Sequence, residues 1–319
     1  MPSCTTSGPP VLSSAFHKRH RVLDVLTGSM VAVVTPMDAD GAINYRDFGR
    51  LLEFHVQAGT EALIVAGTTG ESATLDHAEH VELIERACEL ARGRVPIIAG
   101  TGSNSTAQTL ALSQAVGRLS IAAFLVVTPY YNKPTQEGML RHFSAIADAV
   151  EHPVLLYNVP GRTAVDLKPE TVVKLAAHAN IAGIKEATGE LDRVRMLREQ
   201  CGPQFVLLSG DDATACEFML QGGDGVISVT GNVAPQQMRQ LCDAARAGRR
   251  AEAERIDAAL QGLHRTLFSE SNPIPVKWAV QKMGLIGPGI RLPLTPFSPQ
   301  FHAGVLDAMQ AAGVTVSDA

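Results

Sequence analysis

Eight short and almost wholly apolar segments recur along the chain from residue 29 onward. Their side chains do not alternate between apolar and polar positions, a pattern typical of parallel strands that are covered on both faces. Each is followed by enough chain for one helix. The segments occupy residues 30–35, 62–67, 95–101, 122–129, 153–160, 181–187, 205–210 and 225–230.

Between these segments the apolar residues recur with helical spacing, and Asn44, Thr74 and Ser105 are predicted to cap helix N-termini. Alternating strands and helices of this number predict an α/β fold, a (β/α)8 TIM barrel over residues 28–248. A doubly wound open sheet is the competing fold. Its glycine-rich phosphate-binding turn is missing from "VTPMDADG", which follows the first strand, so the barrel is favoured.

The pattern changes after residue 248. Residues 249–270 have helical periodicity, and "SNPIPVKWAVQKMG" and "SPQFHAGVLDAMQAAG" predict two more helices, so residues 249–319 form a C-terminal helical region. The first 27 residues contain Pro, Ser and Thr and a basic cluster, without the continuous apolar segment of a secretory signal. We expect residues 1–27 to be a disordered extension outside the fold, with an organellar transit peptide as the alternative that composition allows.

Composition narrows the class of function. The 319 residues are 45% hydrophobic and 18% charged, as in a soluble globular protein with a large core. A net charge of −5 and an aromatic content of 5% argue against a nucleic-acid-binding surface, and no apolar run is long enough to span a bilayer. The five cysteines are scattered and never form a CxxC pair, which predicts reduced thiols and a cytoplasmic protein.

Reactive side chains collect where the predicted strands end. In a barrel of this kind the active site is built at the carboxyl ends of the strands, so these side chains are predicted to share one rim. Three of the chain's four tyrosines lie in these segments, and phenols are useful proton carriers. The collected residues are Thr68, Thr69, Tyr130, Tyr131, Tyr157, Arg162, Lys185, Glu186 and the "SGDD" turn.

Lys185 lies in the middle of the apolar run "NIAGIKEATG". A buried ammonium needs a partner or loses its proton, and an ion pair with Glu186 is the simplest structural interpretation. However, neighbouring strand residues point to opposite faces, so Lys185 and Glu186 cannot both point inward. Lys185 then shares the lumen with Gly183 and Ala187, whose small size leaves room for a ligand. A neutral amine there can form a Schiff base with a carbonyl, which predicts a carbonyl-lyase or aldol-type enzyme.

Six ordered motifs, "GTTGESATL", "VTPYYNKPTQEG", "YNVPGRT", "GIKEATG", "LLSGDDA" and "NPIPVKWA", together resemble the dihydrodipicolinate synthase (4-hydroxy-tetrahydrodipicolinate synthase) family. The resemblance runs from about residue 28 almost to the C-terminus. It implies a lyase of the Schiff-base class I aldolase superfamily that condenses pyruvate with L-aspartate 4-semialdehyde in the diaminopimelate route to lysine. It also implies that no metal and no organic cofactor take part, because the protonated imine is the electron sink.

The resemblance assigns roles to four catalytic positions. Lys185 matches the lysine that forms the imine with pyruvate, and Tyr157 matches the phenol that moves protons at that imine. Thr69 and Tyr131 match its partners in a proton relay, with Tyr131 supplied across a subunit interface. Hydroxyl groups suit a relay because each one both donates and accepts a hydrogen bond.

The resemblance also assigns substrate contacts. Thr68 and Thr69 match the residues that bind the carboxylate of pyruvate through hydroxyl and backbone N–H groups. Arg162 matches the arginine that receives the carboxylate of the second substrate, for which a guanidinium fork is well shaped. Gly210 and Ile227 match positions whose backbone surrounds the pyruvate.

In feedback-inhibited members of the family, lysine binds at a dimer interface beside the second loop and helix. Gln108 stands where lysine-sensitive relatives usually have glutamate, and loss of that carboxylate removes a partner for an ammonium group. His77 and His80 could instead be an exposed helix face, and they lack the further ligands of a metal site. The matching effector positions are Ser72, Ala73, His77, His80, Asn104, Gln108 and Tyr130.

Two rival functions stay open. N-acetylneuraminate lyase and keto-sugar-acid aldolases share the lysine, the tyrosine and the glycine-rich turn, but usually lack the arginine of "PGRT". A barrel without enzymatic activity that uses its pocket for binding or as a scaffold is the rival from another class. The resemblance further implies a homotetramer, built as a dimer of dimers, with small-molecule substrates. The composition above predicts no nucleic-acid or membrane partner.

Overall fold

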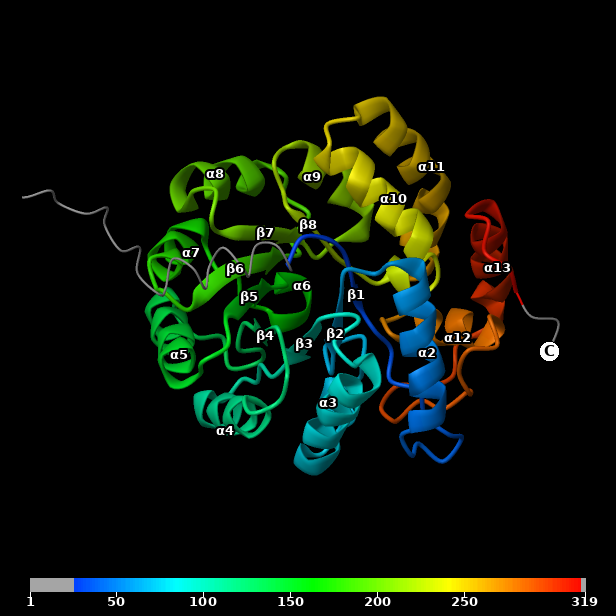
Figure 1. Ribbon diagram of the computed structural model, residues 1–319, viewed down its shortest axis with the longest axis horizontal. Coiled ribbons are helices and arrows are strands. Elements are labelled where there is room, and N and C mark those ends of the chain that lie inside the picture. The colour runs from blue at the N-terminus through cyan, green and yellow to red at the C-terminus, as the bar shows by residue number, and fades with distance from the viewer. Residues whose placement is uncertain (1–25, 317–319) are drawn as a thin grey trace, which may run out of the picture.

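The computed structural model describes residues 26–316, in which eight parallel strands form a closed barrel inside a ring of helices (Figure 1). Each strand pairs with the next, and the first closes against the last. The predicted TIM barrel is confirmed, and an open sheet is excluded. The strands are β1 (Gly28–Ala32), β2 (Ala62–Val65), β3 (Ile97–Gly100), β4 (Ala123–Val127), β5 (Val154–Asn158), β6 (Ile181–Glu186), β7 (Val206–Ser209) and β8 (Gly225–Ser228).

Helices separate the strands and continue beyond the last of them. Around the barrel lie α2 (Tyr45–Ala58), α3 (His77–Ala91), α4 (Thr106–Val116), α5 (Gln136–Ala149), α6 (Pro160–Thr163), α7 (Pro169–Ala176), α8 (Asp192–Cys201), α9 (Ala215–Leu220) and α10 (Pro235–Arg246). The C-terminal helices are α11 (Arg250–Thr266), α12 (Ile274–Lys282) and α13 (His302–Ala311). Short 3-10 turns are η1 (Ser72–Thr74), η2 (Asp212–Thr214), η3 (Thr230–Asn232) and η4 (Pro299–Phe301).

Two of the three predicted helix caps are confirmed. The side chains of Asn44 and Ser105 accept hydrogen bonds from the first turns of α2 and α4. The prediction of Thr74 is wrong, because its hydroxyl is bonded inside the preceding turn, to the carbonyl of Glu71. Asp76 caps α3 instead, in a capping box with Glu79 that satisfies two otherwise free N–H groups.

The first strand begins earlier and ends earlier than the apolar segment 30–35 predicts, at Gly28 and Ala32. The backbone nevertheless continues to form hydrogen bonds with neighbouring segments after Ala32. Val33 N–H donates to the carbonyl of Ile64, and Val34 N–H donates to the side chain of Asn232. An apolar run therefore marks buried extended chain, of which only part is in the β-ladder.

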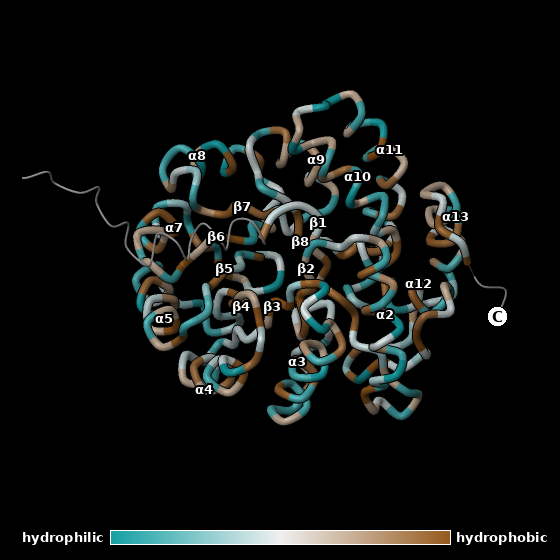
Figure 2. Tube along the Cα trace, viewed as in Figure 1, coloured by the Kyte–Doolittle hydropathy of each residue, from teal (hydrophilic) through white to brown (hydrophobic). Residues whose placement is uncertain are grey.

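The apolar residues form two layers, one on each side of the barrel wall. The outer layer fills the space between the strands and the helices, and the inner layer fills the lumen with residues such as Met30, Ile64, Leu155 and Leu208. Figure 2 shows the hydrophobic colour along parts of the strands and both colours along the helices. Burial on both faces is the reason why the strands lack polar alternation.

The C-terminal helices extend the ring at one side. α11 packs against α10 and α13, and Figure 1 shows α12 and α13 on the side of the barrel formed by α2 and α10. The division into a barrel and a separate helical region stays a prediction. The predicted extension over residues 1–27 lies almost wholly outside the described residues. Within residues 26–316, no helix combines the length and the apolar character needed to cross a membrane.

Two buried histidines predict a loss of stability in mild acid. Burial lowers the pKa of His55 to about 3 and that of His142 to about 4, from 6.5 for both. The unfolded chain therefore binds more protons than the folded chain once the pH falls below about 6.5. We expect each histidine to remove about 2 kcal/mol of unfolding free energy between pH 7 and pH 5.

Urea denaturation at the two pH values, at one protein concentration, measures this loss. His55→Leu cannot take up the proton, so we expect its loss between pH 7 and pH 5 to be about 2 kcal/mol smaller than that of the wild type. His77→Gln, at an exposed position of α3, is the control and should retain the full loss. An equal loss in the wild type and in His55→Leu would show that the burial of His55 has no such effect.

Candidate active site

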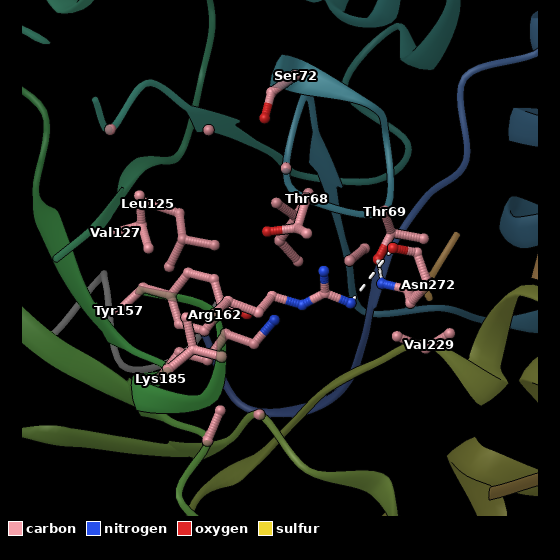
Figure 3. A pocket seen from close by; sticks show the side chains of 18 of the residues that line it. Thr68, Thr69, Ser72, Leu125, Val127, Tyr157, Arg162, Lys185, Val229 and Asn272 are labelled. Carbon is pink, nitrogen blue, oxygen red and sulfur yellow. Dashed lines mark hydrogen bonds between the residues drawn. The ribbon is translucent and has the colours of Figure 1, made fainter. Parts of the chain in front are cut away.

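A cavity of about 160 Å³ opens at the carboxyl ends of the strands. Its walls come from loops that are far apart in the sequence and meet only because the barrel closes (Figure 3). Of the predicted catalytic and substrate-binding residues, those that line it are Thr68, Thr69, Tyr157, Arg162, Lys185 and Gly210.

Lys185, the penultimate residue of β6, lines this cavity with only 5% of its surface exposed. The register of β5 and β6 pairs it with Tyr157, and its amine lies 4.3 Å from the centre of the tyrosine ring. Gly210 makes the space for the lysine, because a Cβ atom there would lie 2.8 Å from Lys185 Cε and 2.7 Å from Ala187 Cβ. Gly183 does not line the cavity, contrary to expectation, since its missing side chain admits the carbonyl of Val206 on the neighbouring strand.

Glu186 points away from the lumen and is not the partner of Lys185. Its carboxylate accepts hydrogen bonds from the Asn158 side chain at 3.2 and 3.3 Å and from Thr188 N–H at 2.9 Å. Arg193 Nη1 lies 3.5 Å from it, and burial raises the pKa of Glu186 against the opposing effect of this arginine. Within residues 26–316, Lys185 forms no ion pair. The amine is therefore buried without the partner that a structural lysine would need.

A hydrogen bond between Asn158 and Glu186, on the outer side of the barrel wall, supports Tyr157 and Lys185 on the inner side. Asn158 and Glu186 are paired in the strand register directly after Tyr157 and Lys185. Because strand residues alternate between faces, each inward reactive side chain is followed by an outward polar one, and these two bond to each other. The bond ties together the strand ends that carry the phenol and the amine.

The turn after β2 presents Thr68 and Thr69 to the cavity. The N–H groups of Gly70 and Glu71 bond back to Gly67 and Thr68. By contrast, the N–H groups of Thr68 and Thr69 donate to no acceptor among residues 26–316. Free backbone donors beside two hydroxyl groups form a suitable site for an anionic group.

Arg162 reaches the cavity from α6, the short helix after β5. Its Nη2 donates to the carbonyl of Asn272 at 3.2 Å, and the side-chain amide of Asn272 donates to Thr69 Oγ1 at 3.0 Å. Figure 3 shows these two bonds on the side of the cavity opposite Tyr157. The guanidinium of Arg162 and the Thr68–Thr69 turn therefore flank the same space as the buried amine of Lys185.

Two predicted site residues lie elsewhere in the single chain. Tyr131 is 87% exposed, adopts the left-handed backbone conformation with a φ of 75°, and does not line the cavity. Ile227 is buried in the lumen layer, also without lining the cavity. The hydroxyl of Thr69 is bonded to Asn272, so the predicted relay of Thr69, Tyr157 and Tyr131 is not assembled within this chain.

A second cavity, of about 580 Å³, adjoins the first and shares Thr68, Ser72 and Arg162 with it. The Gln108 side chain accepts a hydrogen bond from Ser103 Oγ at 2.9 Å, and His80 is buried with its ring bonded to the carbonyl of Gly100. No cluster of three metal-binding side chains is found among residues 26–316. Asn104 does not line this cavity. The predicted effector residues that do are Ser72, Ala73, His77, His80, Gln108 and Tyr130.

Sequence reasoning missed the contribution of the C-terminal region to the site. Phe268 and Asn272 line the first cavity, and Lys277 of α12 is buried beside the two-threonine turn in an ion pair with Glu71. The motif "NPIPVKWA", which contains Asn272 and Lys277, gave the signal, since a lysine within an apolar helix needs a partner. Periodicity alone could not indicate where that partner lies.

Comparison with known proteins decides the family. The model of the dihydrodipicolinate synthetase family matches residues 25–312. The chain belongs to this family. The match covers the whole barrel and the C-terminal helices, so the family includes the helical region that contributes Asn272 and Lys277 to the neighbourhood of the site.

Relatives of the family are similar over nearly their full length. A protein of Thioalkalivibrio sulfidiphilus (strain HL-EbGR7) named 4-hydroxy-tetrahydrodipicolinate synthase is 58% identical over 290 residues, which are 91% of this chain and 99% of the relative. One of the same name from Shewanella sp. (strain ANA-3) is 53% identical over 92% of this chain and 100% of the relative. The solved structure of the chloride-inhibited dihydrodipicolinate synthase from Acinetobacter baumannii, complexed with pyruvate, is 49% identical with a TM-score of 0.89, covering 91% of this chain and all of that one.

Proposed function

We propose that this chain is a 4-hydroxy-tetrahydrodipicolinate synthase, a lyase that condenses pyruvate with L-aspartate 4-semialdehyde in the diaminopimelate route to lysine. The observation that supports this most is the buried Lys185 amine, which faces Tyr157 at the carboxyl end of β6 and has no ion-pair partner among the described residues. The chain's relatives of this name are similar over almost their full length.

The reaction begins at the amine of Lys185. Its lone pair attacks the keto carbon of pyruvate, and loss of water gives an imine between Lys185 and pyruvate. Loss of a proton from the methyl carbon converts the imine to an enamine, because the protonated imine nitrogen accepts the electron pair. The enamine carbon then attacks the aldehyde carbon of the semialdehyde, and the aldehyde oxygen takes up a proton. The amino group of the second substrate finally displaces Lys185 as the ring closes. No metal or organic cofactor is needed.

Hydroxyl groups move the protons of this sequence. Tyr157 is placed to act at the imine, since its ring lies directly beside the amine of Lys185. Thr69 and Tyr131 are its partners, with Tyr131 provided by another subunit of a homotetramer that is a dimer of dimers. The high exposure of Tyr131 in the single chain supports this exchange. We place the enzyme in the cytoplasm.

Two anion sites orient the substrates. Thr68 and Thr69 bind the carboxylate of pyruvate with their hydroxyl groups and free N–H groups. The guanidinium of Arg162 binds the carboxylate of the semialdehyde. Gly210, which makes room for the lysine, and Ile227 of the lumen layer contribute backbone groups around the pyruvate.

The second cavity is the candidate site for lysine as an effector. Its walls include His77, His80, Gln108 and Tyr130. Gln108 brings no negative charge to an ammonium group there, and its amide oxygen is already bonded to Ser103. We therefore propose a weaker response to lysine than in relatives with glutamate at this position.

Turnover by the purified enzyme tests the proposed function. With pyruvate and aspartate semialdehyde we expect condensation, measured as consumption of both substrates. With pyruvate and N-acetylmannosamine, the substrates of the N-acetylneuraminate lyase reaction in reverse, we expect none, because Arg162 serves a short carboxylate-bearing aldehyde. Turnover of the sugar without turnover of the semialdehyde would assign the chain to the rival lyases.

A further inference from the structure

We infer that Glu71 and Lys277 are positioning residues for pyruvate, forming a buried ion pair through which the C-terminal region holds the Thr68–Thr69 turn in its binding conformation. This inference rests on the proposed function. Neither side chain lines the cavity, so the pair acts through the turn and not by touching the substrate. The helical region beyond the barrel therefore takes part in pyruvate binding indirectly, through the turn.

The contacts of Glu71 lead from the turn to the C-terminal region. Glu71 lies two residues after Thr69 and is only 2% exposed. One carboxylate oxygen binds the amine of Lys277, which is 4% exposed in α12, and the other accepts a hydrogen bond from Arg291 N–H at 3.2 Å. Both oxygens therefore bind groups that lie more than two hundred residues further along the chain.

The turn needs such support because its backbone is strained at both ends. Ala66 before the two threonines has a φ of 54°, and Glu71 after them has a φ of 58°. This left-handed conformation is unfavourable for a residue with a side chain and persists where the surroundings enforce it. Lys277 enforces it at Glu71, and Asn272 holds Thr69 between the two ends through its 3.0 Å hydrogen bond.

The two buried lysines of the described chain, Lys185 and Lys277, differ in whether they have a carboxylate partner. Burial lowers the pKa of Lys277, and the carboxylate of Glu71 opposes that shift, so this amine has a partner that keeps it in place. Lys185 is equally buried but has no carboxylate partner among residues 26–316 and faces the cavity. Burying an ion pair contributes little net stability, which suggests that a pair next to a binding turn serves to define one conformation.

Four variants test the inference: Glu71→Gln, Lys277→Met, the double variant that combines both, and Asp224→Asn as a control. Borohydride trapping at graded pyruvate concentrations gives the half-saturating pyruvate concentration for adduct formation on Lys185, and steady-state assays give kcat. Asp224 pairs with Arg198 and precedes β8, at the opposite end of the barrel from the cavity. The Arg198–Asp224 ion pair thus has no link to the turn, and its side chains are more exposed, at 23% and 25%, than those of Lys277 and Glu71.

We expect each single variant to raise the half-saturating pyruvate concentration at least about tenfold with a smaller change in kcat, because displacement of a binding group weakens binding steeply. The double variant has no unpaired buried charge, so it should regain thermal stability but not pyruvate affinity. Asp224→Asn should lose thermal stability and keep wild-type pyruvate affinity.

Three outcomes would overturn the inference. The first is wild-type pyruvate affinity in the double variant, which tests the inference even where a single variant does not fold. The second is an equal loss of affinity in Asp224→Asn, which would make the effect one of general stability. The third is the absence of any adduct in the wild-type enzyme. That result would refute the proposed function itself, and it is distinguished by the wild-type sample alone.

Discussion

Replacement of Lys185 by alanine is expected to lower kcat by at least about 10³-fold, equivalent to about 4 kcal/mol of transition-state stabilisation. In the proposed mechanism the amine provides the covalent attachment of pyruvate, and no other side chain that lines the cavity carries an amine. The fold should survive, since the lysine forms no ion pair among residues 26–316 and Ala187 and Gly210 already leave space around it. A coupled assay of the condensation product, with circular dichroism to check folding, measures the effect.

Lys174→Ala is the matched control for this variant. Lys174 is exposed in the last turn of α7, away from the cavity, and its loss should leave kcat unchanged. Activity of Lys185→Ala within a factor of ten of the wild type would contradict the proposed mechanism. It would mean that the barrel polarises pyruvate without a covalent bond.

Replacement of Arg162 by alanine is expected to impair use of the semialdehyde while leaving imine formation with pyruvate intact. Pyruvate should still form its imine on Lys185, because in the proposed mechanism its carboxylate is bound by Thr68 and Thr69 and not by Arg162. The apparent second-order rate constant for the semialdehyde should fall at least about 100-fold, as expected when a carboxylate loses a charge-assisted, two-pronged contact. Borohydride trapping measures the first step, and steady-state kinetics with varied semialdehyde measure the second.

Arg162→Lys retains the positive charge and loses the planar fork, so we expect it to recover only part of the lost activity. Arg162 also donates a hydrogen bond to the carbonyl of Asn272, which opens a structural alternative. Equal loss of imine formation and of semialdehyde use in Arg162→Ala would support that alternative, in which the arginine merely orders the site.

The barrel could be predicted because its strands are buried on both faces. A segment such as β4, Ala123–Val127, is apolar throughout, and its repetition eight times with helices between leaves few architectures. The exact ends were less predictable. Asp76 rather than Thr74 caps α3, because the hydroxyl of Thr74 is taken up by a local turn that periodicity does not reveal.

The core of the site was also predictable, since reactive residues at strand ends must meet in a closed parallel barrel. Strand alternation resolves the contradiction posed by Lys185 next to Glu186. On the outer side of the barrel wall the glutamate accepts a hydrogen bond from Asn158 and forms an ion pair with Arg193. The support of the Thr68–Thr69 turn was not predictable. Glu71 and Lys277 are far apart in sequence, and only the packed structure brings them together.

Tyr131 is the predicted catalytic residue that lies outside the cavity of the single chain. The family resemblance gives it a place in the proton relay, yet the single chain exposes it and keeps it out of the cavity. Its backbone adopts the left-handed conformation, with a φ of 75°. Its role in the reaction therefore stays a proposal about an assembly of several chains.

The central claim is that Lys185 is the nucleophile, and covalent trapping tests it most directly. The purified full-length enzyme is incubated with pyruvate, reduced with borohydride, digested and analysed by mass spectrometry. We predict one stable pyruvate adduct on the peptide that contains Lys185, and none on the peptide that contains the equally buried Lys277. An adduct on Lys277, or no adduct at all, would contradict the account.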